Sequence, residues 1–436
     1  MVPRSLLVLL ATSVALVAPV RGASAQQADR SGVDAVRILR SLRDPRHPPI
    51  ESLVGDFVRH SHSVPGFLFG MLRDGRVPDL GQGAQVLSVD QRDLILAGFA
   101  KLGRSGTLSS LSAELTELDT VAERRAAVEL LGAVGREQDL EQVIDLALRP
   151  EDAVLSRAMA DAVQRATTAI LRRDPEAYRW LARSWRSAPQ ELLVPTILAV
   201  GEAEDPRGLD FLHELIVARE ELLIPAAAQI PRLGVSDDRS LNEDLAARLR
   251  DLVDPADASR SRTLCQALGA LEDLAAVPQL IELLASESRG LKQAAHAALG
   301  RATGLAFPAE TLRWTHWLRE ERAWMTSEKD DAFRLLRSRN DGEIARAIHE
   351  IEAHPLARVE LLEALEELLH SARPSSQIQA CAAAGRLERR ELVRVLIEVL
   401  EDPSPEVVGA AHQALQKVTG FDLPDDPARW RERFPS

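Results

Sequence analysis

Two histidine–glutamate pairs come closest, in residue type and spacing, to the ligands of a metal ion. His213 is followed by Glu214, and His349 is followed by Glu350. Imidazole nitrogens and carboxylate oxygens are common ligands of zinc and other transition metals, so two such pairs facing one another would suit a bound ion. The pairs lie in unlike sequences, DFLHELIV and RAIHEIEAH, and they do not correspond in the internal repeat described below. We therefore assign no metal ligand to them.

Four further histidines are candidate binding residues. His60 and His62, in RHSHSVPG, make half a metal site at best, and a polar loop is the simpler interpretation. His296 and His412 each follow two alanines in equivalent helical segments, off the centre of the apolar stripe. We predict that these two either contribute to a binding surface on the concave side of a helical stack or bond a neighbouring helix or loop.

Recognisable catalytic motifs were not found in the sequence. It contains no G-x-S-x-G, no H-E-x-x-H, no glycine-rich phosphate loop and no cysteine in the setting of a nucleophile. Adjacent carboxylates such as Glu220-Glu221 and Glu366-Glu367 fit solvated helix faces. The sequence thus predicts a protein that is not an enzyme, with no catalytic residue and no cofactor.

A long internal repeat organises the elements that carry these residues. Residues 265–314 return at 381–430 without insertion or deletion, and about 20 of the 50 aligned positions are identical. Apolar residues recur at helical spacing almost throughout, whereas residues 103–112 are predicted to form a loop. With only 4% aromatic residues, such a chain builds thin helical layers, each of which buries its apolar face against the next.

Each copy of the repeat ends in the pattern T-G-x-x-x-P followed by a tryptophan. Gly304 and Gly420 are placed where a helix ends in a left-handed residue. Pro308 and Pro424 then prevent the helix from continuing, and Trp314 and Trp430 come ten residues after the glycines. We predict that each tail folds back as a structural cap over exposed apolar helix ends.

The stretch Ala383–Leu415 resembles the HEAT-repeat family in its order of G-x-L, V-x-x-L-I-E-x-L and D-P-x-P-E-V-x-x-A-A-x-x-A-L. The resemblance implies an all-α, right-handed solenoid of stacked helical hairpins and a role in binding other proteins. The T-G-x-x-x-P…W ending is similar to those of exported bacterial HEAT-repeat proteins. A HEAT-repeat enzyme, deoxyhypusine hydroxylase, uses four His-Glu pairs to hold two irons, but this chain has two pairs in unlike contexts.

The first 25 residues have the pattern of a secretory signal peptide. Arg4 precedes the apolar run from Ser5 to Val20, and Ala23-Ser24-Ala25 forms a small-residue cleavage site. Export to the periplasm, cell envelope or exterior is therefore expected, without a membrane span after cleavage. Cys265 and Cys381 occupy the same position in the two repeat copies, which we expect to lie about 30 Å apart, too far for a disulfide.

The net charge of −13 bears on the partner. Nucleic-acid binding is not expected, because no basic cluster stands out in the sequence. We predict a non-enzymatic scaffold whose concave acidic surface binds a protein or peptide, preferably a basic one. A repeat-based enzyme, a metal- or ligand-binding protein and a structural part of a cell-envelope assembly remain as alternatives. The predicted divisions are residues 1–25 (signal peptide), 26–118 (divergent helical region), 119–325 and 326–436 (two repeat blocks).

Overall fold

The computed structural model describes residues 63–77, 85–111, 114–115, 118–149, 152, 154–236, 238–371 and 373–434. The predicted signal peptide, together with His60 and His62, lies outside these residues. The described chain divides into two compact units that meet between Ala199 and Val200. The boundaries expected at 118/119 and 325/326 remain predictions.

In its described residues, the first unit is helical apart from one very short pair of strands. The strands β1 (Arg76–Val77) and β2 (Gln85–Val86) pair antiparallel. Its helices are α4 (Ser63–Asp74), α5 (Val89–Ser110), α6 (Val121–Val134), η1 (Glu137–Asp139), α7 (Leu140–Ala147), α8 (Arg157–Arg173), α9 (Glu176–Ser184), η2 (Trp185–Ser187) and the start of α10 (Gln190–Ala203).

The second unit is helical throughout its described residues. It contains α11 (Gly208–Ala218), η3 (Glu220–Leu222), α12 (Leu223–Ala227), α13 (Ile230–Leu233), α14 (Arg239–Asp251), α15 (Ala258–Ala270), η4 (Leu274–Ala276), α16 (Val277–Leu283), α17 (Arg289–Thr303) and α18 (Thr311–Ser327). It continues with α19 (Lys329–Leu335), α20 (Asp341–Glu352), η5 (Pro355–Ala357), α21 (Arg358–Leu369), α22 (Pro374–Leu387), η6 (Arg390–Leu392), α23 (Val393–Val399), α24 (Pro405–Thr419) and α25 (Pro427–Arg433).

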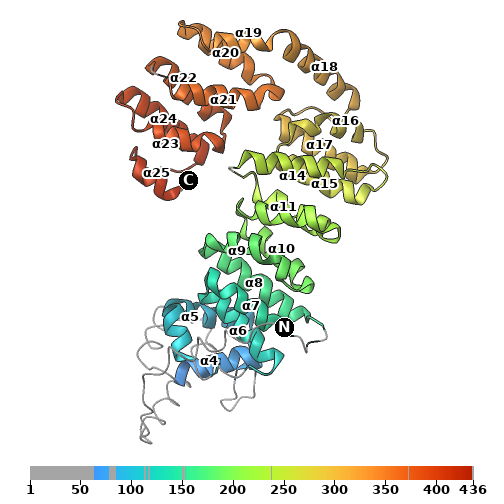
Figure 1. Cartoon of the computed structure of the whole chain (residues 1–436), viewed down its shortest axis with the longest axis vertical. Helices are drawn as coiled ribbons and strands as arrows, with labels where there is room; N and C mark the ends of the chain where they lie inside the picture. Colours follow the sequence, from blue (N-terminus) through green and yellow to red (C-terminus); the bar gives the residue numbers. More distant parts are fainter. Residues whose placement is uncertain are drawn as a thin grey trace, which may run out of the picture. The chain divides into compact units, whose positions relative to one another are not determined.

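A repeated three-helix arrangement underlies both units. A long helix is followed by a 3₁₀ turn and a short helix, and the next long helix packs against the first. The closely packed long pairs are α6 with α8, α15 with α17 and α22 with α24 (Figure 1). The short helices α7, α16 and α23 pack against the second member of each pair. The predicted all-α solenoid of stacked helices is therefore confirmed.

Small residues allow the paired helices to approach closely. A methyl group added at Gly132 of α6 would lie 2.6 Å from the Cα of Ala166, and one at Gly269 of α15 would lie 2.7 Å from the Cα of Ala298. Real Cβ atoms do not come so close to backbone, so each glycine is required by its neighbour. This packing accounts for the Ala- and Gly-rich helices, because a larger side chain at the crossing would force the layers apart.

Local signals in the sequence set the helix ends. Thr120 and Glu123 form a reciprocal capping box at the start of α6, and Ser88 and Gln91 form another at the start of α5. The loop predicted for residues 103–112 was wrong, because α5 extends to Ser110 and is broken only at Gly103, which has a φ of 73°. The buried Thr107 holds this last part of α5 by donating its hydroxyl to the Phe99 carbonyl, 3.0 Å away.

Arginines from later helices bind the ends of earlier ones. Arg173 donates to the carbonyls of Gly132 and Gly135 at the end of α6, at 3.1 and 2.6 Å. Arg358 donates to the carbonyls of Ala302 and Thr303 at the end of α17, at 2.8 and 3.1 Å. Cations at a helix C-terminus interact favourably with its dipole and with the carbonyls left unpaired there. Burial is the main reason that the pKa of Arg358 is lowered to about 10.

Candidate functional site: the repeated caps and the α15–α17 groove

The two histidine–glutamate pairs do not form a metal-binding arrangement. The side chain of His349 is 89% exposed, and its Nδ1 lies 3.9 Å from a carboxylate oxygen of Glu352. Glu350 accepts a hydrogen bond of 3.4 Å from Nε1 of Trp324. His213 is half-buried on α11. Within the described parts of the chain, no three His, Cys, Asp or Glu side chains gather closely enough to hold an ion.

The two repeat copies end their long helices in nearly the same way. Gly304 has φ 77° and ψ 4°, and Gly420 has φ 72° and ψ 4°. Their amides donate to Gly300 and Gln416 at 2.8 and 2.9 Å, which satisfies carbonyls of the last helical turn. The preceding Thr303 closes the turn further, because its hydroxyl donates to Leu299 and accepts from the amide of Leu305.

In each tail, a buried tryptophan donates a hydrogen bond to the loop that precedes its helix. Trp314 and Trp430 are both 0% exposed. The Trp314 indole donates to the Pro308 carbonyl at 3.0 Å, and the Trp430 indole donates to the Pro424 carbonyl at 2.7 Å. Trp430 lies on the short helix α25, whereas Trp314 lies on the longer α18, which also packs against α16 and α19. The first tail therefore lies inside the second unit.

His296 and His412 take part in these tails. Their Nε2 atoms lie 2.7 Å from the Phe307 carbonyl and 2.6 Å from the Leu423 carbonyl. A carbonyl oxygen only accepts, so Nε2 of each ring carries the hydrogen in this contact. The rings also meet the cap tryptophans edge-on, with centroids 6.4 and 6.3 Å apart. This matches the predicted alternative in which each histidine bonds a nearby loop, and a role in binding a partner stays a prediction.

A buried histidine–carboxylate contact was not predicted from the sequence. Glu321 of α18 is 3% exposed, and its carboxylate lies 2.9 Å from Nδ1 of His354 and accepts the Leu356 amide at 3.0 Å. The His354 ring stacks on Trp324 with centroids 3.7 Å apart. Glu321 thus supplies, from another helix, the oxygen that caps η5. Its partners lie more than 30 residues away, and no local pattern indicates them.

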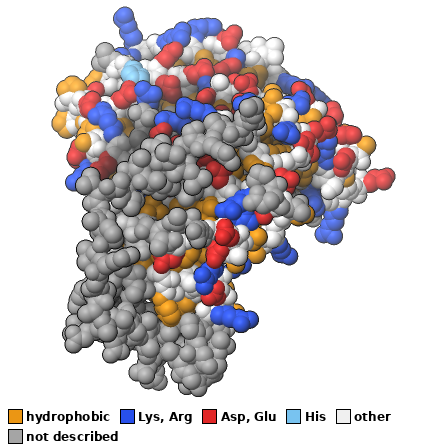
Figure 2. All heavy atoms as spheres, turned by 60° about the horizontal axis from the view of Figure 1, so that its bottom comes forward, with side chains coloured by type: hydrophobic (Ala, Val, Ile, Leu, Met, Phe, Trp, Pro, Cys, Tyr) orange, Lys and Arg blue, Asp and Glu red, His pale blue; other side chains and the backbone are white. Residues whose placement is uncertain are grey.

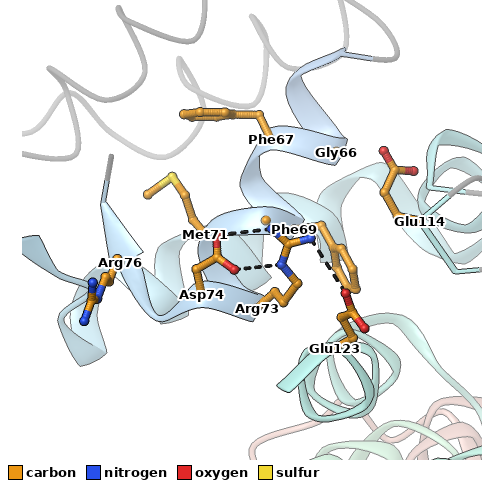
Figure 3. Close-up of a pocket in the computed structure, with 10 residues that line it drawn as sticks. Gly66, Phe67, Phe69, Met71, Arg73, Asp74, Arg76, Glu114 and Glu123 are labelled. Carbon is orange, nitrogen blue, oxygen red and sulfur yellow. Dashed lines mark hydrogen bonds and ion pairs between the residues drawn. The ribbon is translucent and has the colours of Figure 1, made fainter. Parts of the chain in front are cut away.

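A cavity of about 440 Å³ lies beside α4 in the first unit (Figure 3). Its most central cation is engaged, because Arg73 donates to Asp74 at 2.7 Å and lies 3.9 Å from Glu123. The hydrogen bond from Arg73 is the main reason that the pKa of Asp74 is lowered. The arrangement is a set of ion pairs around apolar side chains such as Phe69, without a nucleophile and base in contact.

A groove of about 410 Å³ runs between α15 and α17 in the second unit. Its floor is made of the small residues at the helix crossing, including Gly269 and Ala298. Its walls carry the exposed polar side chains Arg262, Gln266, Gln293 and Arg301. The volume falls within the range typical of ligand sites. The groove can therefore accept an extended chain with charged or hydrogen-bonding groups.

The chain's net charge is not spread evenly over its surface. On the face drawn in Figure 2, acidic and basic side chains are interspersed over the described residues. In contrast, α15 and α17 contain no Asp or Glu, although acidic residues outnumber Lys and Arg by 66 to 53 in the whole chain. The groove is therefore locally cationic in an acidic protein.

Comparisons with known proteins support the repeat architecture in part of the chain. A family model described as HEAT repeats matches residues 362–429. A search of curated proteins found no match. Among solved structures, the chain is similar to an engineered protein from a structural genomics consortium, with 16% identity and a TM-score of 0.32, over 88% of this chain and 98% of that one. Across the described residues, no helix is both long and apolar enough to cross a membrane.

Proposed function

We propose that this helical-repeat protein is a non-enzymatic scaffold that binds a protein or peptide partner. HEAT repeats generally present helix faces to other proteins, and residues 362–429 match them. The observation that carries the proposal is the open groove between α15 and α17, which has the volume of a ligand site and polar walls on a small-residue floor. Parallel helices provide such a groove without rearranging, which lowers the entropic cost of binding.

Selection from a library of displayed random peptides tests this function. Full-length protein is immobilised and a folded, unrelated protein serves as the control surface. We expect enrichment of peptides that share a motif and that are displaced by the same protein free in solution. Repeated selections that enrich nothing beyond the control surface would contradict the scaffold function.

We also propose that the protein is exported, on the strength of its first 25 residues. Expression in a bacterium followed by mass spectrometry of the intact protein tests this proposal. Cleavage after Ala25 would give a chain that begins at Gln26 and is found outside the cytoplasm. A chain that retains Met1 and stays in the cytoplasm would contradict export.

The charge of the partner follows from the local site. The net charge of −13 led us to expect a basic partner on an acidic concave surface. For the α15–α17 groove we set this expectation aside, because its two helices carry cations and no carboxylate. Net charge averages over a whole surface, whereas recognition depends on the groups that meet the partner.

A further inference from the structure

We propose that the α15–α17 groove binds an extended acidic peptide segment, with Arg262 and Arg301 contacting carboxylates near its two ends. This inference rests on the proposed scaffold function and names the chemistry of the partner. Arginine suits the task because its planar guanidinium pairs with carboxylates through two parallel hydrogen bonds.

Among the described residues, the cations of the groove have no carboxylate partner. Elsewhere in the described chain many arginines form ion pairs, among them Arg104 with Asp139 and Arg250 with Asp273. Of the five cations on α15 and α17, Arg260 lies 3.5 Å from a carboxylate oxygen of Glu220. The other four lie more than 4.0 Å from any carboxylate oxygen of the described residues: Arg262, Arg289, Lys292 and Arg301. Four uncompensated cations on two adjacent helices create a positive potential that attracts acidic ligands.

The register of the two helices places the arginines at opposite ends of the groove. The Cδ atom of Arg262 lies 3.5 Å from where a methyl group would stand on Gly290, in the first turn of α17, while Arg301 lies in the last turn. Eleven residues of helix separate these positions, which corresponds to about 16 Å at 1.5 Å per residue. An extended peptide rises about 3.3 Å per residue, so about five residues span the groove.

The side chains between the arginines suit a peptide backbone. Gln266 and Gln293 are exposed and lie in the middle of the groove, one on each helix. Each amide offers both a donor and an acceptor, so it can bond the N–H or C=O groups of an extended chain. The arginines would then select for charge, and the glutamines would hold the backbone.

In the equivalent helix pair α6–α8, a carboxylate of the chain itself forms ion pairs with arginines. Gly132 and Ala166 meet there as Gly269 and Ala298 do in α15–α17. Three residues before the glycine, α6 has Glu129 where α15 has Gln266. Glu129 is 5% exposed and forms ion pairs with Arg165 of α8, at 3.2 Å, and with Arg92 of α5.

Glu129 is thus an intramolecular counterpart of the proposed ligand. In α6–α8 a carboxylate of the chain occupies the helix crossing and pairs with arginine. In α15–α17, Gln266 takes the place of Glu129 and Ala297 takes the place of Arg165. The cations of this groove, Arg262 and Arg301, stand at other positions along it. A carboxylate from a partner would give Arg262 or Arg301 the kind of ion pair that Arg165 forms with Glu129 in the first unit.

The second repeat copy shows that the fold does not require Arg262 or Gln266. Gly385 of α22 packs against Ala414 of α24, and a methyl group added there would lie 3.4 Å from the Ala414 Cα. Arg262 and Gln266 correspond to Ile378 and Ala382 in this copy. The packing glycine is kept while these wall residues change, so the arginine and glutamine are not needed for helix packing.

Fluorescence anisotropy with labelled peptides tests the proposal on the full-length protein. The probes are a peptide of alternating Glu and Ser and matched peptides with Gln or Lys in place of Glu. We expect the Glu peptide to bind most tightly, with an affinity that falls as salt is added. The double variant Arg262→Gln/Arg301→Gln should weaken binding at least about tenfold, which corresponds to about 1.4 kcal/mol.

Matched variants separate the groove from a general effect of charge. Arg319→Gln/Arg322→Gln removes two exposed cations of α18, and it should leave the affinity within about twofold. Gln266→Glu introduces the carboxylate that Glu129 provides in α6, and it should also weaken binding. Ala382→Glu adds the same charge at the equivalent position of α22 and should have little effect. Circular dichroism confirms that each variant is folded.

The outcomes distinguish this inference from the scaffold function. Unchanged affinity of the Glu peptide for Arg262→Gln/Arg301→Gln, or equal losses in the α18 double variant, would overturn the acidic-peptide site. Preferential binding of the Gln or Lys peptide would also overturn it, while leaving a peptide-binding scaffold in place. Failure of the random-peptide selection would instead contradict the scaffold function itself.

Discussion

Replacing Trp314 by alanine should destabilise the second unit by about 4 kcal/mol. The ring is fully buried, its indole N–H donates to Pro308 at 3.0 Å, and it meets Phe307 and Trp317 edge-on, with centroids 5.1 and 5.8 Å away. A buried tryptophan removes about 150–250 Å² from water, worth about 4–6 kcal/mol at about 25 cal/mol per Å² as an upper bound. Measured costs of such truncations are about 3–5 kcal/mol.

Urea unfolding followed by far-ultraviolet circular dichroism measures this change without depending on tryptophan fluorescence. With a slope of about 3 kcal/mol per M, the midpoint of the second unit should fall by about 1.3 M. Trp314→Phe keeps most of the ring contacts and loses the N–H bond, so it should cost about 1–2 kcal/mol. Leu312→Ala is the control, because Leu312 is 86% exposed on the same helix and should change stability by less than about 0.5 kcal/mol.

A small effect of the alanine variant would contradict the packing described for Trp314. If Trp314→Ala moved the midpoint no further than Leu312→Ala, the ring would not be packed as the structure shows. A large effect of Trp314→Phe that equalled that of Trp314→Ala would assign the stability to the hydrogen bond and not to burial.

Three further predictions concern single groups. Burial raises the pKa values of Cys265 and Cys381 to about 12, so neither thiol should be alkylated in folded protein at pH 8. After unfolding without reductant, alkylation should add two adducts, as measured by mass spectrometry. Fewer than two adducts would indicate a disulfide. The hydrogen bond from Arg124 is the main reason that the pKa of Asp152 is lowered to about 2 from 3.8. The ionised Asp152 carboxylate should therefore stabilise the folded state fully above about pH 4, and this stabilisation should disappear towards pH 2. In acid unfolding, Asp152→Asn should lack this loss of stability between about pH 4 and pH 2. Gly304→Ala puts a side chain at a φ of 77° and should cost about 1 kcal/mol in thermal unfolding, whereas an unchanged melting temperature would count against a left-handed terminator there.

The helical layers were predictable because their signals are local and repeated. The 116-residue offset aligns helix ends, packing glycines and tails, so the T-G-x-x-x-P pattern indicates Gly304 and Gly420 as terminators without any knowledge of the partner helices. The failure at residues 103–112 has a local cause as well. Gly103 interrupts the helical pattern, but the hydroxyl of Thr107 bonds back to Phe99 and the helix resumes.

The candidate site was not predictable, because it depends on which side chains meet across helices. Glu129 and Arg165 are 36 residues apart, and their contact follows from the register of α6 on α8. Arg262 and Arg301 look like ordinary solvated cations in the sequence. Only the packed helices show that they stand at the two ends of one groove without a carboxylate beside them. The same holds for Glu321, which caps a turn more than 30 residues away.

The three helix pairs share one packing contact and differ beside it. All three keep a glycine facing an alanine at the crossing, because that contact sets the distance between the layers. The position three residues before the glycine is free of this constraint, and it is Glu129 in α6, Gln266 in α15 and Ala382 in α22. In the first pair the carboxylate forms ion pairs within the chain. In the third pair the position is Ala382, and Lys417 stands where α17 has Arg301. In the second pair, Arg262 and Arg301 have no carboxylate partner among the described residues, and we propose that a ligand supplies one. If the proposed site is correct, specificity in this protein should change through such wall residues while the packing glycines stay fixed.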